Sequence, residues 1–424
     1  MEQESEQQYA PDDQVVKNII PLMEQPVPYA VYGAAYIEQG AFMQMENAAR
    51  LPVTVAGALM PDAHHGYGLP IGGVLATDNA VIPYGVGVDI GCRMCLSIFE
   101  MDVTELDTKI PFFKRELIAA TLFGSGSTFK RPHDHEVLTH AAFNEIELLK
   151  TLHGRAWKQL GSSGSGNHFV EFGVVEIAEQ DDVLGVPAGT YVGLLSHSGS
   201  RALGANIAGH YTKLAKELRQ LPPDAANLAW LDLAEEAGME YWIAMNLAGD
   251  YASACHHIIH EKVARQLGLS PLKMVENHHN FAWKEQHEGR EVIVHRKGAT
   301  PAGKDVLGVI PGSMTAPGFI VKGRGVASSV SSAAHGAGRR MSRSQAFKQV
   351  TRDAMKETLT MHGVTLVGGG LDEAPFAYKD IEAVMASQSD LVATVGKFTP
   401  KIVQMCGDAP RRSNKRKGGM AEGE

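Results

Sequence analysis

Hydrophobic positions follow two different spacings along this chain. Between residues 51 and 100, short apolar runs alternate with glycine-rich loops, which predicts strands. Over 135–160, and again over about 201–268, apolar residues recur at helical spacing, and Pro222 and Pro223 interrupt the second stretch. The same two spacings predict further strands at 167–179, 190–197, 290–303 and 318–325, and a helix at 342–359.

This mixture of separate strands and helices predicts the α+β class and one large domain. No internal repeat and no proline- or serine-rich linker divides the chain. We therefore expect a polar N-terminal tail and lead-in (1–50), a single domain (51–407) with a helical insertion (about 201–268), and a disordered C-terminal tail (408–424).

Composition and charge narrow the class of protein. The 424 residues are 44% hydrophobic, and no apolar run reaches the ~18 residues needed to span a bilayer. The acidic N-terminus lacks the layout of a signal peptide, and four cysteines are too few for a disulfide scaffold. We therefore expect a cytoplasmic protein without a membrane partner. The net charge of −9 argues against indiscriminate coating of nucleic acid but allows a local basic groove.

Candidate metal ligands lie in glycine-, serine- and asparagine-rich segments at predicted strand ends. They are one carboxylate, one thiol and several imidazoles, in "GVGVDIGCRM", "GSGNHFVEF", "LLSHSGSR", "ENHHNFA" and "AAHGAGRR". This mixed set suits Mn²⁺, Zn²⁺ or Co²⁺, and a bridging thiolate would allow two ions, a recurring device in phosphate chemistry. The alternative is that Asp89 caps a turn, Cys92 is a small buried hydrophobe and each histidine is a hydrogen-bonded structural residue.

Other histidines have a different interpretation. His256, His257 and His260 recur at helical spacing, which predicts a polar helix face. His64 and His65 follow Asp62 in "MPDAHHGYG", where a structural role in the loop and contact with substrate are both open.

Three glycine-rich segments can bind anions through backbone N–H groups. They are "GSSGSGNH", "PGSM" and "HGAGR", and ordinary turns are the alternative, because no Walker A sequence or dinucleotide fingerprint occurs. A local basic excess in the sequence favours a groove for a polyanion. Its members are Arg201, Arg296, Lys297, Lys322, Arg324, Arg339, Arg340 and Arg343.

Nine motifs in fixed order resemble the RtcB family of RNA ligases. They are "MPDAHHGYGLPIGG", "GVGVDIGCRM", "GSGNHFVEF", "HSGSR", "HHNFA", "HRKGATPAG", "PGSM", "HGAGRRMSR" and "DEAPFAYKD", and they extend over most of the chain. The resemblance implies the RtcB-type α+β fold, with stacked β-sheets around a deep metal pocket and flanking helices. It also implies a GTP- and Mn²⁺-dependent ligase that joins RNA 3′-phosphate or 2′,3′-cyclic phosphate ends to 5′-hydroxyl ends. Broken or spliced tRNA or rRNA would be the substrate, in RNA repair or tRNA splicing, with an archease-type activator as a possible partner.

The resemblance also assigns site residues. The matched positions for two Mn²⁺ ions are Asp89, Cys92, His168, His197 and His279, with Cys92 as the bridge. His335 matches the histidine that takes GMP covalently. The segments around the guanine nucleotide match Asn167, His168, Phe169, Val170 and Glu171; His279 and Asn280; Pro311, Gly312, Ser313 and Met314; and His335, Gly336, Ala337 and Gly338.

Several positions depart from the family pattern and mark a divergent member. Arg93 follows Cys92 where the family has glycine, which predicts added charge beside the site. Cys255 and His256 replace an asparagine–arginine pair, which predicts altered RNA contacts, and Gly318 lies where the family has serine or tyrosine.

The C-terminus departs most. Cys406 replaces the family's terminal lysine, which contacts guanine, so nucleotide preference is open; Arg411, Arg412 or Lys415 could supply the missing donor. Two other function classes also remain: a metal-dependent phosphodiesterase or phosphatase acting on RNA ends, and a noncatalytic protein that binds RNA ends.

Overall fold

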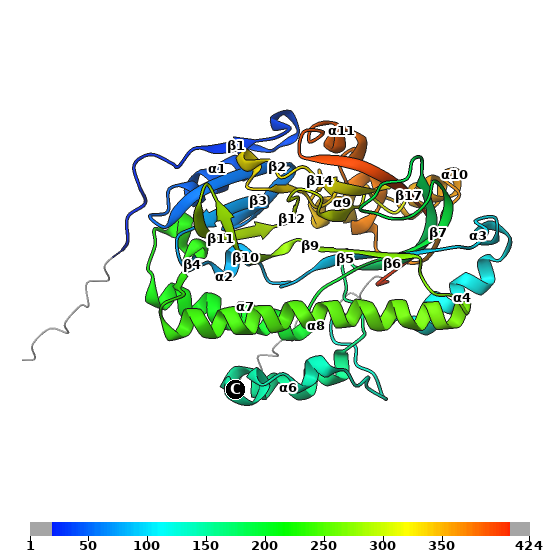
Figure 1. Ribbon diagram of the computed structural model, residues 1–424, viewed down its shortest axis with the longest axis horizontal. Coiled ribbons are helices and arrows are strands. Elements are labelled where there is room, and N and C mark those ends of the chain that lie inside the picture. The colour runs from blue at the N-terminus through cyan, green and yellow to red at the C-terminus, as the bar shows by residue number, and fades with distance from the viewer. Residues whose placement is uncertain (1–18, 408–424) are drawn as a thin grey trace, which may run out of the picture.

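The computed structural model describes residues 19–407, and its strands form two large sheets (Figure 1). The predicted tail 408–424 and residues 1–18 of the N-terminal tail lie outside the described residues. The five-stranded sheet has the order β1 (Tyr29–Val31), β2 (Thr54–Tyr67), β3 (Leu69–Thr77), β11 (Arg290–Lys297) and β10 (Asn280–His287). The eight-stranded sheet has the order β13 (Leu307–Ile310), β14 (Gly318–Gly323), β17 (Val392–Met405), β6 (Phe169–Ile177), β7 (Gly189–Ser198), β5 (Arg93–Phe99) and β9 (Lys273–His278), with β16 (Thr365–Gly368) beside β17.

The eight-stranded sheet curls until its ends meet. Its first and last strands, β13 and β9, lie against each other, and the Asn277 side chain bonds both the N–H and the carbonyl oxygen of Val309. Two small ribbons complete the strands: β12 (Ala299–Pro301) with β15 (Ser332–Ala334), and β4 (Ala80–Val81) with β8 (Leu231–Asp232). The α+β class and the two stacked sheets are therefore confirmed.

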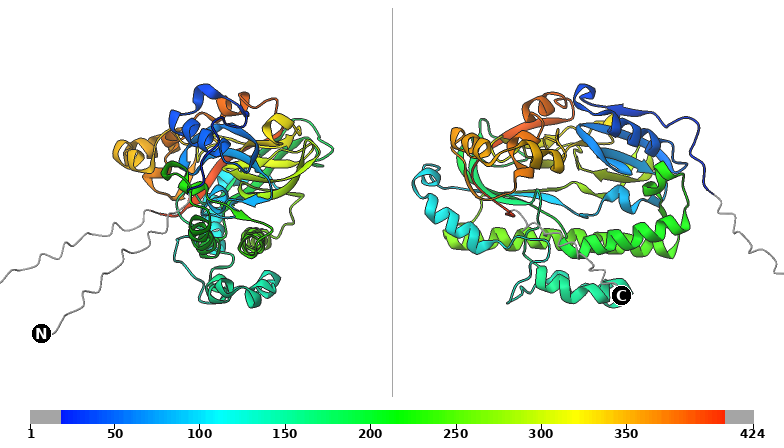
Figure 2. Two further views of the ribbon diagram at one scale, coloured as in Figure 1. Left: turned by 90° about the vertical axis from the view of Figure 1, so that its left-hand side faces the viewer. Right: turned by 180° about the vertical axis from the view of Figure 1, so that it is seen from behind.

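Helices cover the outer face of the curled sheet. The two longest, α7 (Arg201–Leu218) and α8 (Glu236–Leu267), run side by side below the strands, and α6 (Glu147–Gln159) lies beneath α7 (Figures 1 and 2). The remaining helices are α1 (Gln39–Ala49), α2 (Pro83–Val86), α3 (Glu105–Thr108), α4 (Ile110–Ala120), α5 (Ala142–Glu145), α9 (Arg343–Gln349), α10 (Arg352–Met361) and α11 (Ile381–Ala386). Short 3₁₀ helices are η1 (Ala34–Tyr36), η2 (Glu136–Thr139), η3 (Pro223–Leu228), η4 (Ala327–Ser329), η5 (Leu371–Glu373) and η6 (Pro375–Ala377). Within residues 19–407, no helix is long and apolar enough to cross a membrane.

Alternation along the strands decides which side chains point to the inner face of the curled sheet. In β7, Val192 and Leu194 pack outward against α4 and α8, whereas Leu195 packs inward. Because successive side chains point to opposite faces, His197 faces inward and Ser196 faces α8. The same parity in β5 turns Met94 and Leu96 inward, and the metal-ligand candidate Cys92 precedes them.

Two expectations about elements are corrected. The segment "MPDAHHGYGLPIGG" is not a free loop, because it forms the facing ends of β2 and β3 with an irregular register. Gly68, at φ +72°, makes the turn, and Gly72, at φ +85°, lets β3 approach β2 where a Cβ would lie 2.6 Å from the Ala63 Cα. The long helix also begins later than predicted, at Glu236, because residues 231–232 pair with β4 as β8.

Candidate active site

A cavity of about 390 Å³ lies where the two sheets meet. The curled sheet contributes Cys92, Phe169 and His197 to its wall, and the segment leading from β9 into β10 contributes His279. His335, which follows β15, closes the other side. The cavity therefore collects residues that are far apart in the sequence, such as Cys92 and His335, which are separated by 243 positions.

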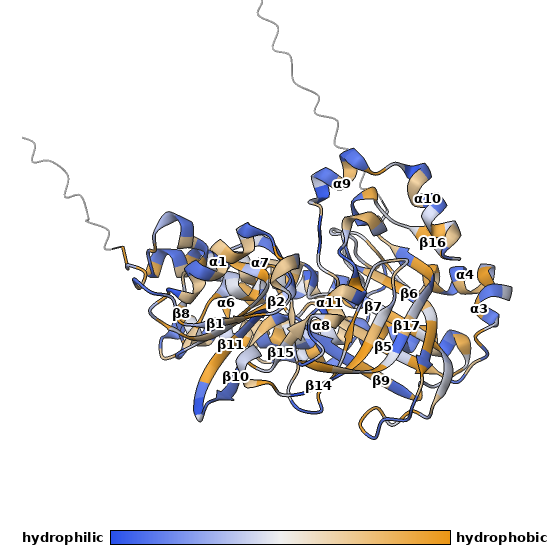
Figure 3. Ribbon diagram, turned by 90° about the horizontal axis from the view of Figure 1, so that it is seen from above, coloured by the Kyte–Doolittle hydropathy of each residue, from blue (hydrophilic) through white to orange (hydrophobic). Residues whose placement is uncertain are grey.

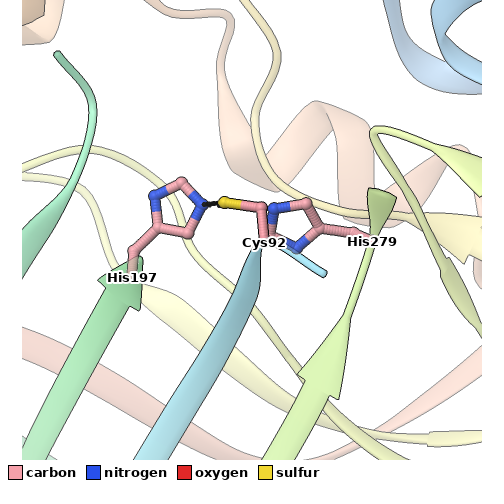
Figure 4. Close-up of side chains that lie close together, drawn as sticks. All are labelled: Cys92, His197 and His279. Carbon is pink, nitrogen blue, oxygen red and sulfur yellow. Dashed lines mark hydrogen bonds between the residues drawn. The ribbon is translucent and has the colours of Figure 1, made fainter. Parts of the chain in front are cut away.

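The centre of the cavity holds one thiol and two imidazoles that face one another (Figure 4). His197 Nε2 lies 3.1 Å from Cys92 Sγ and 3.1 Å from His279 Nε2. His197 Nδ1 is 3.0 Å from the carbonyl oxygen of Asn167, which can only accept a hydrogen bond, so Nδ1 carries the proton and Nε2 carries a lone pair. A lone pair buried against a thiol and a second imidazole fits a cation better than a hydrogen bond.

A second group shares the same thiol. His168 Nε2 lies 2.9 Å from Asp89 Oδ2 and 3.6 Å from Cys92 Sγ. Burial alone would raise the pKa of Asp89, but the charge of His168 and its hydrogen bond lower it to about 2. Burial is also the main reason that the pKa of His197 falls to about 3, so its imidazole is neutral. Cys92 thus belongs to two groups of three possible ligands, Asp89–Cys92–His168 and Cys92–His197–His279.

The loop that carries Asp89 and Cys92 is held from outside by Arg93. Its guanidinium donates to the carbonyl oxygens of Gly91, at 3.2 Å, and Gly249 of α8, at 2.6 Å, and it pairs with Glu276 of β9. Gly91 has φ +70°, and a Cβ there would lie 2.8 Å from the Gly249 Cα. Strand alternation turns Arg93 toward α8, where it pairs with Glu276, so its charge lies behind the site, from where it acts to lower the pKa of the Cys92 thiol against the larger effect of burial.

His335 is oriented by a carboxylate that sequence reasoning missed. His335 Nδ1 lies 2.7 Å from Asp62 Oδ2, and its backbone N–H donates to the same oxygen at 3.1 Å. Asp62 is fully buried, and its oxygen accepts from Nδ1, so in the neutral imidazole the lone pair is on Nε2. The His335 ring centre is 4.9 Å from that of His279. The acid in "MPDAHH" was the signal for this partner, but 273 residues separate it from His335.

The two histidines that follow Asp62 lie in different surroundings. His64 lines the cavity, and burial lowers its pKa to about 4. His65 is exposed and packs beside Gly40 of α1 instead.

The predicted nucleotide segments also surround the cavity, but two of their residues do not line it: His168, which lies beside Asp89 and Cys92, and Val170. Val170 lies on the outer face of β6, in the core beneath α4 and α8. Glu171 is buried in the cavity wall, and burial raises the pKa of its carboxyl group well above the usual value. The cavity-lining members are Asn167, Phe169, Glu171, His279, Asn280, Pro311, Gly312, Ser313, Met314, His335, Gly336, Ala337 and Gly338. Sequence reasoning did not assign the lining residues Arg339, Arg343, Glu373 and Tyr378 to the nucleotide.

The comparison with protein families decides the class. Residues 44–149 and 127–405 match the family model described as tRNA-splicing ligase RtcB. This chain belongs to the RtcB family. The RNA-splicing ligase RtcB of Escherichia coli (strain K12) is 34% identical, over 85% of this chain and 92% of that protein. The RNA-splicing ligase RtcB of Mycobacterium tuberculosis is 33% identical, over 84% and 99%, and the tRNA-splicing ligase RtcB of Nanoarchaeum equitans is 30% identical, over 89% and 95%.

This RtcB chain also contains a buried hydrogen-bonded chain behind the cavity. His256 Nε2 donates to the Ser198 carbonyl oxygen at 3.2 Å, so its Nδ1 accepts from the Ser196 hydroxyl at 2.6 Å. Ser196 Oγ accepts in turn from His260 Nε2 at 2.7 Å, and His260 Nδ1 accepts from Ser97 at 2.7 Å. The predicted polar helix face is therefore wrong for His256 and His260, which are buried between α8 and the sheet.

The same region of the RtcB chain offers a third possible ligand group, Cys95–His256–His260. Here the Ser196 hydroxyl already bonds the two facing imidazole nitrogens, whereas no hydroxyl separates the imidazoles in the cavity. The donor set of the cavity therefore fits divalent ions better. Cys255 and His256, expected to alter RNA contacts, are both buried and reach no surface.

Proposed function

We propose that this RtcB-family chain is an RNA ligase that joins RNA 3′-phosphate or 2′,3′-cyclic phosphate ends to 5′-hydroxyl ends. It uses GTP, two Mn²⁺ ions and a covalent His335–GMP intermediate. One observation carries this proposal: the shared thiol of Cys92 and the oriented imidazole of His335 open into one cavity. The family membership supports the ligase class, and the geometry supports the division of roles.

Five side chains would hold the ions, and the ions would polarise phosphate oxygens and neutralise charge that develops during transfer. The ligands are Asp89, Cys92, His168, His197 and His279. Two sets of three that share one thiolate give a place for each of two ions.

His335 is the proposed nucleophile. Its Nε2 attacks the α-phosphorus of GTP, the new N–P bond forms and pyrophosphate leaves. Asp62 holds the Nδ1 proton and stabilises the positive charge that the ring gains. GMP then passes to an oxygen of the RNA 3′-phosphate, which frees His335. The 5′-hydroxyl oxygen attacks the activated 3′-phosphorus and expels GMP.

The guanine would lie among the nucleotide segments that line the cavity. Glu171 is buried there and offers its carboxyl group to a base edge, whereas the carboxylate of Glu373 already binds Arg339, Arg343 and Tyr378. Broken or spliced tRNA or rRNA is the proposed substrate, in the cytoplasm, with an archease-type protein as activator.

Covalent labelling tests the proposal. The protein is incubated with Mn²⁺ and α-labelled GTP and then denatured, and we expect label on the wild type and none on His335→Ala. His65→Ala is the matched control and should label like the wild type, because His65 lies outside the cavity. Undiminished label on His335→Ala would overturn the assignment. Turnover of RNA ends by His335→Ala, without label on any variant, would indicate the phosphodiesterase alternative.

A further inference from the structure

Helix α9 leads outward from the cavity wall. Its first residue, Arg343, lines the cavity and lies beside Gly166, next to the segment that carries Asn167. The helix packs on η5 and η6, and with α10 it forms a lobe that stands beside the curled sheet (Figure 3). A nucleic-acid strand that leaves the cavity past Arg343 would therefore meet the exposed face of α9.

This lobe begins with a run of basic residues. Residues 339–352 contain five basic residues and no acidic one, in a chain whose net charge is −9. Two of them, Arg339 and Arg343, pair with Glu373, and Arg343 also pairs with Asp372. Lys348 is exposed and makes no ion pair with another residue of the described part. Its charge is available to an anion from outside.

Phe347 is the second unusual feature of α9. Its ring is 48% exposed, although the neighbouring Ala346 and Val350 are buried and hold the helix down. Phe347 lies four residues after Arg343, so the two share one helix face, about 6 Å apart along the axis. Within residues 19–407 it stacks on no other aromatic ring. An exposed aromatic ring beside an unpaired lysine, one turn from a phosphate-binding cavity, fits a nucleic-acid strand.

We propose that Phe347 and Lys348 bind the RNA strand that leaves the cavity. A base stacks on the Phe347 ring, and a backbone phosphate lies at the Lys348 ammonium group. Phe347 lies about 6 Å along the helix axis from an end held at Arg343, so this contact falls on the nucleotide next to that end. Stacking of this kind tolerates any base, as a repair enzyme for many ends requires. The inference rests on the proposed function in taking RNA as the substrate and the cavity as the place of its 3′ end.

Affinity for single-stranded RNA tests the inference. A fluorescent ten-nucleotide RNA with a 3′-phosphate is titrated with protein, and anisotropy is measured. We expect Phe347→Ala to weaken binding about 5- to 150-fold, the range for loss of one stacked base, and Phe347→Trp to retain it. Lys348→Gln should lower the slope of log affinity against log salt by about 0.7. Met361→Ala is the matched control, since Met361 is 70% exposed at the far end of α10 and should bind like the wild type.

Length of the RNA separates this contact from the cavity itself. A mononucleoside 3′-phosphate occupies only the end held at Arg343, so Phe347→Ala should bind it as the wild type does. Equal affinity of Phe347→Ala and wild type for the ten-nucleotide RNA would overturn the inference, and the exposed face would then serve another partner, such as a protein. If the wild type takes no label from GTP while Phe347→Ala still loses RNA affinity, the proposed chemistry fails and the inference stands.

Discussion

Cys92 is the residue on which both ligand groups of the cavity depend. Burial, together with the nearby Asp89 carboxylate, raises the pKa of its thiol well above the usual value. Without a cation the thiol is therefore protonated, and binding of an ion must displace that proton. Because the two groups share only this side chain, its loss affects both ions, whereas loss of His279 affects one.

Metal content should reflect this difference. We expect Cys92→Ala to lose about two ions per chain and His279→Ala about one, measured by elemental analysis after dialysis against Mn²⁺. Cys255→Ala is the control, since Cys255 is a buried thiol that belongs to none of the possible ligand groups among the described residues. The same metal content in Cys92→Ala and His279→Ala would argue against a bridging thiolate.

Cys406 follows the last strand, at the position where the resemblance to the family leads us to expect a lysine. A thiol is a weak hydrogen-bond donor, and loss of a charge-assisted bond costs about 1.5–3 kcal/mol, or about 10- to 150-fold in affinity. We expect Cys406→Lys to label better with GTP relative to ATP than the wild type does. The alternative donors Arg411, Arg412 and Lys415 lie outside the described residues. If Cys406→Lys changes nothing and truncation after Gly407 abolishes the preference for GTP, the tail supplies the donor.

At the scale of strands and helices, the local sequence pattern predicts many of the elements but little of the pairing between distant residues. The β-branched run at 190–197 predicts β7, and its alternation is enough to place His197 and Ser196 on opposite faces. The partners of those faces are not local. Asp62 reaches His335 only because the β12–β15 ribbon packs against β2, and α8 covers Ser196 only because the curled sheet presents its outer face.

The histidines of α8 illustrate the limit. A helical spacing of polar residues normally indicates a solvated face, and this interpretation holds for the half-exposed His257. The interpretation fails for His256 and His260, because serines on β5 and β7 form hydrogen bonds that compensate the buried imidazoles for lost hydration. Only the three-dimensional pairing of strand and helix shows this.

Two serines of β7 offer a test of that buried chain. Ser196→Ala leaves two buried imidazole nitrogens without their partner, so we expect a loss of about 2–4 kcal/mol in the free energy of unfolding. Ser198→Ala is the matched control, because the Ser198 hydroxyl is buried without a hydrogen-bond partner and its removal should cost far less. Urea unfolding of both variants measures the difference. Equal losses would mean that the chain adds no stability.

At the scale of the whole molecule, Lys297 joins separate parts of the fold. Its ammonium group, buried at the end of β11, donates to the carbonyl oxygens of Tyr67, at 2.5 Å, and Tyr84, at 3.1 Å. Burial lowers its pKa from 10.5 to about 7. Between these two values the unfolded chain binds a proton that the folded chain does not, so stability rises with pH.

The rise of stability with pH leads to a prediction for Lys297. Between pH 7 and 9, the free energy of unfolding of the wild type should rise by about 2 kcal/mol relative to Lys297→Met, which has no group to titrate there. Denaturant unfolding at both pH values measures it. A constant difference between wild type and variant would show that the folded lysine keeps its proton throughout this range.

The contact between Asp62 and His335 also has a consequence for synthesis of the chain. The two residues are 273 positions apart, and a ribosome adds roughly 5–20 residues per second. Asp62 is therefore made about 14–55 s before its partner. By the later part of that interval the nascent chain carries cavity ligands such as Cys92 and His197 but not His335. Any ion captured during translation is held by a chain that cannot yet carry out the proposed transfer.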